Sequence, residues 1–84
     1  MYLHIGNEVS IPLRKIIAII DLETVDPTGQ LQEMIEQAKR QEKVSLTSGR
    51  SEPKSCIITD DRLYLSSISA TTLARRAGLK DRIP

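Results

Sequence analysis

The sequence predicts a small α+β fold whose elements follow the order βββαβββα, in a single domain spanning residues 1–84. Six short runs have strand character, because they alternate apolar and polar residues or are rich in β-branched ones. Two segments show helical spacing of apolar residues. Because the helices do not alternate regularly with the strands, we expect a mainly antiparallel sheet.

The N-terminal half is predicted to hold a hairpin and a central strand. Residues 2–5 and 8–11 alternate, and Gly6–Asn7 between them is a two-residue turn signal. Pro12 has no N–H to donate and should end the second strand. The unbroken aliphatic run over residues 16–20 predicts a central strand buried on both faces.

The first helix is predicted over residues 29–42, with Thr28 as its N-cap. Its apolar positions recur at spacings of three and four, as expected for one buried stripe. They are Leu31, Met34, Ile35 and Ala38. The opposite face of this helix is charged and polar. Contact with solvent accounts for these residues, so they do not indicate a ligand.

Three strands and a second helix are predicted for the C-terminal half. The strands cover residues 44–46, 55–59 and 62–65, with a tight turn at Asp60–Asp61 between the last two. Ser69 should cap a helix that runs to Ala77, and Gly78 is a stop signal.

Composition excludes several classes of protein. The chain has no Trp or Phe and only two Tyr, so its core must be aliphatic, and self-association would help to cover apolar strand faces. A net charge of +1 argues against non-specific coating of nucleic acid. The single cysteine, Cys56, lies in an apolar run and excludes a disulfide framework. We expect a soluble, cytoplasmic homo-oligomer that does not enter a membrane.

The sequence offers no arrangement typical of catalysis. His4 is the only histidine, and Cys56 has no motif around it. Asp60–Asp61 supplies too few oxygens for a calcium loop, and no Gly-rich phosphate loop is present. We therefore expect no enzyme activity, no metal and no cofactor.

Cations on two loops form the candidate binding site. Loop 48–54 contains Gly49 and Pro53 and carries Arg50 and Lys54, while Arg14 and Lys15 precede the predicted central strand. If these loops cluster, the DNA-binding residues would be Arg50, Lys15, Arg14 and Lys54. Without aromatic side chains, such a patch fits duplex backbone contact better than single-strand stacking. The alternative is that loop 48–54 is a solvated β-hairpin tip with incidental charge.

The adjacent Arg75 and Arg76 have two interpretations. They lie near the end of the second helix, where cations compensate the helix dipole without any ligand. The alternative is contact with DNA or with another subunit. Because neighbouring helical residues point about 100° apart, at least one of the two must be on the surface.

Four segments of the chain resemble the bacterial extracellular matrix regulators, the RemA/RemB family. The segments are residues 1–8, 14–19, 53–59 and 69–77, so the resemblance covers nearly the whole chain. Residues 1–8, MYLHIGNE, and residues 52–55, EPKS, look most like the B-type member.

The resemblance implies a cytoplasmic regulator of biofilm matrix genes in Gram-positive bacteria. The A-type member is a DNA-binding activator that assembles into a ring, with DNA thought to run along the outer rim. Its arginine before the central strand corresponds to Lys15, with Arg14 beside it. Its arginine pair after a glycine corresponds to Arg50 and Ser51, so the second arginine is missing here. Lys54 stands where the A-type member has a further arginine, one residue on.

Two hypotheses follow from these observations. The first is a DNA-binding transcriptional regulator that acts as a homo-oligomer, a ring by resemblance, and contacts the duplex backbone. The alternative is an oligomeric scaffold that binds a protein partner, such as an A-type homologue, with little or no DNA binding. The cations before the central strand favour the first, and the near-neutral charge and missing arginine favour the second.

Overall fold

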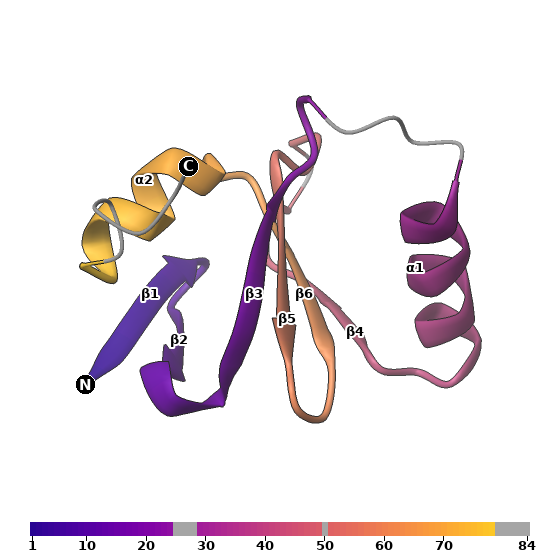
Figure 1. Ribbon diagram of the computed structural model, residues 1–84, viewed down its shortest axis with the longest axis horizontal. Helices are drawn as coiled ribbons and strands as arrows, with labels where there is room; N and C mark the ends of the chain where they lie inside the picture. The colour runs from indigo at the N-terminus through magenta and orange to yellow at the C-terminus, as the bar shows by residue number, and fades with distance from the viewer. Residues whose placement is uncertain (25–28, 50, 79–84) are drawn as a thin grey trace.

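The predicted order of elements is confirmed by a computed structural model, which describes residues 1–24, 29–49 and 51–78 (Figure 1). One 3-10 turn, η1 (Leu13–Lys15), is added to the predicted elements. The helices are α1 (Gln30–Arg40) and α2 (Ala70–Arg76). The strands are β1 (Tyr2–Gly6), β2 (Val9–Pro12), β3 (Ile16–Asp21), β4 (Val44–Leu46), β5 (Ser55–Thr59) and β6 (Leu63–Ser66). The chain is therefore α+β, with the predicted bounds shifted only at element ends.

The β1–β2 hairpin forms as predicted, but its turn lies one residue later than expected. Asn7 and Glu8 occupy the turn with φ of 50° and 62°, as a two-residue type I′ turn requires. Gly6, with φ of 110°, instead ends β1 at a register shift that begins after His4. A Cβ on Gly6 would lie 3.4 Å from the carbonyl oxygen of Thr47, so glycine permits both the conformation and the close approach.

Strand β3 is an edge strand, which makes the prediction of a central position wrong. The four-stranded sheet has the order β3–β5–β6–β4. Ile17 in β3 is 68 % exposed, whereas Ile57 in β5 is fully buried. A run of β-branched residues indicates a strand. Which strands pair with it depends on contacts between segments distant in sequence. The strands with partners on both sides are β5 and β6.

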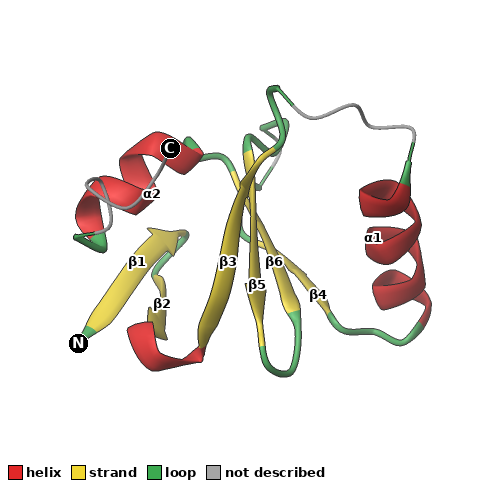
Figure 2. Cartoon of the chain, in the orientation of Figure 1, coloured by secondary structure: helices red, strands yellow, loops and turns green. Residues whose placement is uncertain are grey.

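The four-stranded sheet is mixed rather than antiparallel throughout. Strand β5 pairs antiparallel with β3 and with β6, but β4 runs parallel to β6. The chain reaches β4 by way of α1, which allows the parallel direction (Figure 2). Since β6 lies between β4 and β5, loop 48–54 joins strands that are not neighbours. The interpretation of this loop as a β-hairpin tip is therefore wrong.

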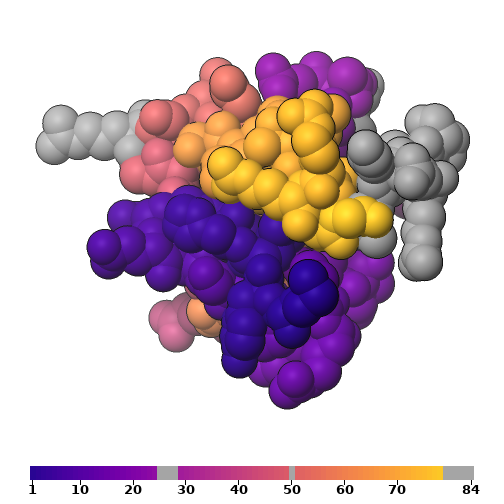
Figure 3. All heavy atoms as spheres, turned by 90° about the vertical axis from the view of Figure 1, so that its left-hand side faces the viewer, coloured from indigo at the N-terminus to yellow at the C-terminus, as the bar shows by residue number. Residues whose placement is uncertain are grey.

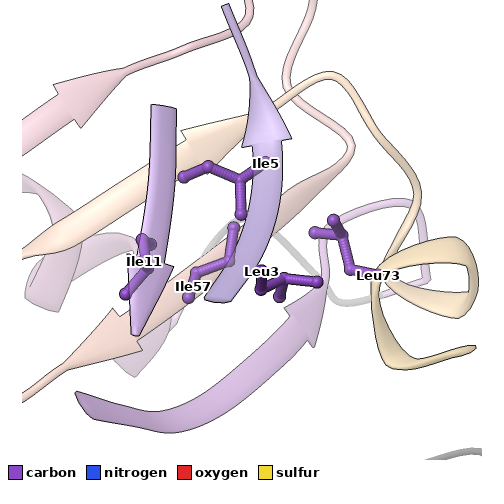
Figure 4. Close-up of a cluster of buried hydrophobic side chains, with 5 residues drawn as sticks. All are labelled: Leu3, Ile5, Ile11, Ile57 and Leu73. Carbon is purple, nitrogen blue, oxygen red and sulfur yellow. The ribbon is translucent and has the colours of Figure 1, made fainter. Parts of the chain in front are cut away.

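The four-stranded sheet lies between two other layers (Figure 1). Helix α1 packs on one face, where Ile35 joins Cys56 of β5 in a buried cluster that includes Leu63 and Leu65. The hairpin and α2 cover the other face. There Ile57 joins Leu3, Ile5, Ile11 and Leu73 (Figure 4). Adjacent residues of β5 thus point into opposite cores, as the two-residue period of a strand requires.

The two helices begin differently. Ser69 caps α2 as predicted, because its Oγ accepts a hydrogen bond from the backbone N–H of Thr72 at 3.2 Å. Helix α1 begins at Gln30 with Gly29 in the N-cap position and no side-chain cap bond, while Thr28 lies outside the described residues. Gly78 follows α2 with φ of 76°, which confirms the predicted stop signal.

Candidate nucleic-acid interface

Arg14 and Lys15 are both exposed, because η1 places them on the outer side of a short 3-10 turn. Pro12 precedes the turn with φ of −57°. Leu13 packs against the core cluster of Ile57 and Leu73, which anchors the turn by its apolar residue. Successive residues of a 3-10 helix point about 120° apart, so an inward Leu13 leaves both cations outside.

Lys15 lies within the electrostatic reach of a carboxylate. The pKa of Asp61 is lowered first by a hydrogen bond from the Thr59 hydroxyl, with Oγ1 and Oδ1 3.0 Å apart, and also by the positive charges of Lys15 and Arg62. Asp61 is therefore ionised at neutral pH and offsets part of the field of Lys15.

The backbone of Lys54 is fixed by two hydrogen bonds, and its side chain lies near two carboxylates. Its N–H donates to the Ser66 carbonyl at 2.7 Å, and its carbonyl accepts from the Leu22 N–H at 2.9 Å. The exposed side chain shares a surface depression with Glu23 and Glu52. These two carboxylates oppose the attraction of a phosphate to Lys54.

Of the predicted cations, the three that the structure describes, Arg14, Lys15 and Lys54, do not converge within one subunit. Strand β3 begins beside Thr59 and ends beside Ser55, which directly follows Lys54. Six residues of strand at about 3.3 Å each therefore place roughly 20 Å between η1 and Lys54. Figure 1 shows η1 at the lower end of β3 and the loop before β5 at the upper end. Any duplex that touches both must span the length of the sheet.

Arg50 lies outside the described residues, so its place relative to the other cations stays a prediction. The residues beside it form a turn in which the Ser51 N–H donates to the Ser48 carbonyl at 3.0 Å. Gly49 has φ of 62°, which favours glycine. Ser48 is buried, and its hydroxyl has no hydrogen-bond partner among the described atoms.

Three further arginines, Arg62, Arg75 and Arg76, differ in their contacts. Arg62 holds β4 against β6, because its guanidinium donates to Ser45 Oγ at 2.6 Å and to the Glu42 carbonyl at 3.2 Å. Arg75 and Arg76 are both exposed on α2. Figure 3 shows α2 above the N-terminal hairpin on one face of the molecule, so these arginines stand in a layer separate from α1.

The two residues weighed for catalysis, His4 and Cys56, differ in burial. His4 is exposed on β1. Cys56 is fully buried, and burial raises the pKa of its thiol to about 11, which disfavours the reactive thiolate. Within the described residues, no group of three or more His, Cys, Asp or Glu side chains could hold a metal ion. No helix in the same part of the chain is long and apolar enough to cross a membrane.

Comparison with known proteins gives two agreeing matches. The family model described as RemA-like, extracellular matrix regulatory protein A-like, matches residues 2–77. The chain is also 30 % identical over 78 residues to extracellular matrix regulatory protein B of Bacillus subtilis (strain 168), covering 92 % of this chain and 90 % of that protein. Both matches run through η1, the four-stranded sheet and α2. The chain therefore belongs to the RemA-like family of extracellular matrix regulatory proteins.

Proposed function

We propose that this protein is a cytoplasmic DNA-binding transcriptional regulator of biofilm matrix genes, acting as a homo-oligomer on the duplex backbone. Family membership supports a role in matrix regulation. The observation that carries the DNA contact is the pair of exposed, adjacent cations on η1, Arg14 and Lys15. A ring of subunits, as expected from the resemblance, would repeat this pair along one duplex. No catalytic step and no cofactor enter the proposal.

Repetition is essential because one subunit offers few contacts. Two cations that each neutralise one phosphate give weak binding, with a salt slope of about −0.9 per contact. Several linked subunits raise the effective concentration of each further contact. Arg50 and Lys54 are assigned to the same DNA-binding set, with Lys54 the weaker because of Glu23 and Glu52 beside it. We therefore place Arg14 and Lys15 at the centre of the interface.

The test is a mobility shift of duplex DNA over a range of salt concentrations. The double variant Arg14→Ala/Lys15→Ala should weaken binding to all sequences alike, because backbone contacts carry no sequence information. The salt slope should fall by up to roughly 2 per bound subunit. Arg40→Ala is the matched control, since Arg40 is an exposed cation on α1, away from η1. Arg50→Ala should also act on all sequences alike.

Two results would refute this assignment. An oligomer that shifts no duplex even at low salt would remove DNA binding from the proposal. A loss confined to particular sequences would show that the substituted residue reads bases instead of contacting phosphates.

The second candidate function is an oligomeric scaffold that binds a protein partner such as an A-type homologue. It is favoured by the carboxylates near two of the predicted cations, Asp61 beside Lys15 and Glu52 beside Lys54. Purified A-type homologue, mixed with this protein without DNA, should then form a stable complex in size-exclusion chromatography. If it does so and no duplex is shifted, the scaffold function replaces the first.

A further inference from the structure

The outer edge of β3 presents backbone groups with no partner strand. Leu22 N–H donates to the Lys54 carbonyl at 2.9 Å, and Asp21 lies opposite Ser55. In an antiparallel pair, hydrogen-bonded and non-hydrogen-bonded pairs alternate. Ile19 and Asp21 therefore direct their N–H and carbonyl groups away from β5. Within the described residues, β5 is the one strand that pairs with β3.

The β3 edge has few of the features that keep edge strands of natural proteins from pairing with another chain. Residues 16–21 contain no lysine and no proline, and Ile17 is 68 % exposed. A bulge does interrupt the pairing, but it is confined to the step between Ile16 and Ala18. Residues 18–21 keep a regular register against β5. Figure 1 shows β3 at one end of the row of strands β3–β5–β6–β4.

The charges that flank β3 are arranged for an antiparallel partner of the same sequence. Arg14 and Lys15 precede the strand, and Asp21 and Glu23 lie at its other end. Antiparallel pairing of two copies brings the cations of each against the carboxylates of the other. The other sheet edge, β4, runs in the same direction as β3, and exposed Lys43 precedes it. Pairing of β3 with β4 in a head-to-tail assembly would bring Lys43 towards Lys15, which is unfavourable.

We propose that β3 is a self-association surface that pairs antiparallel with β3 of a second copy of this chain. The contact is two-fold symmetric and centred on Ile19, which places Lys15 opposite Glu23 of the partner subunit and leaves Arg14 as the η1 cation that faces a phosphate. The two four-stranded sheets then join into one continuous sheet, in which each Ile17 lies opposite Asp21 of the partner subunit. The inference rests on the self-association in the proposed function and specifies its surface. A closed ring would need a second, different contact in addition.

The first experiment compares glutamate substitutions on the two sheet edges by sedimentation over a concentration series. Ile17→Glu places a carboxylate opposite Asp21 of the partner subunit, twice in the symmetric pair, and should weaken association by roughly tenfold or more. Leu46→Glu is the matched control, because Leu46 is 55 % exposed on the opposite edge strand, β4. It should associate as the unmodified chain does. Circular dichroism confirms that both variants fold, since both side chains are exposed.

The second experiment is a charge swap. Lys15→Glu and Glu23→Lys should each weaken self-association, because each places like charges opposite one another twice in the symmetric pair. An equimolar mixture of the two variants restores both attractive pairs and should associate as the unmodified chain does.

Three results would overturn this inference. One is a loss of association in Leu46→Glu as large as in Ile17→Glu. Another is a mixture of charge variants that fails to associate. A third is an oligomer that Ile17→Glu leaves intact, which would refute the β3 contact while the proposed function stands. If the unmodified chain is monomeric at every concentration, both proposals fail together.

Discussion

A buried serine of β6 links the N-terminal hairpin to the sheet by a hydrogen bond. Ser66 Oγ donates to the Ile5 carbonyl at 2.7 Å and accepts from the Ile68 N–H at 3.0 Å. The Ile5 carbonyl lies at the register shift between His4 and Gly6, where the hairpin ladder is interrupted. Ser66 is fully buried, so water cannot replace it. Substitution Ser66→Ala removes both hydrogen bonds and leaves Ile68 N–H without this partner.

The expected destabilisation follows from these two bonds. An intramolecular hydrogen bond contributes about 1 kcal/mol net, so their loss should cost about 2 kcal/mol. Thr47 limits the damage at Ile5, because its hydroxyl is 3.2 Å from the same carbonyl oxygen. For a domain of this size, each kcal/mol lowers the melting temperature by roughly 4–8 °C. Ser66→Ala should therefore melt about 8–16 °C below the unmodified chain.

Thermal and urea unfolding, followed by circular dichroism, measure this difference. Protein concentrations must match, because self-association raises apparent stability. Ser10→Ala is the control, since Ser10 is exposed on β2 and its substitution should change stability by less than about 0.5 kcal/mol. A Ser66→Ala variant as stable as Ser10→Ala would refute the argument that these bonds hold the hairpin to the sheet.

Three further predictions concern charge, ionisation and backbone strain. Asp61→Asn should strengthen duplex binding up to about fivefold in mobility shifts, because it removes the carboxylate that offsets Lys15, while Asp60→Asn should act less. The Cys56 thiol has a pKa of about 11 when folded, against an ordinary 9.0, so the unfolded chain loses the proton first. Stability in urea should therefore fall as pH rises from about 9 to about 11, with a smaller fall in Cys56→Ala. Gly6→Ala should destabilise the fold by about 1 kcal/mol or more in the same assay, because Gly6 has φ of 110°.

The exposure of Arg14, Lys15 and Lys54 was predictable from the sequence, but their arrangement was not. The cations of η1 were found from sequence, and their exposure follows from Leu13 packing into the core. Their separation from Lys54 was not predictable, because it depends on where β3 and β5 begin and end relative to one another. The carboxylate beside Lys15 was missed for the same reason, since Asp61 is distant in sequence and comes close only through the pairing of β3 with β5.

The sequence by itself determined the features that depend on near neighbours along the chain. These are the six strands and two helices, the Ser69 cap and the Gly78 stop. Residue period, capping chemistry and backbone freedom are local, so a single chain reveals them. Tertiary structure alone decided that β3 is an edge, that β4 runs parallel to β6 and that the cations divide between two ends of the sheet. These features depend on contacts between distant segments, in which packing against both sheet faces outweighs the local propensity of any one strand.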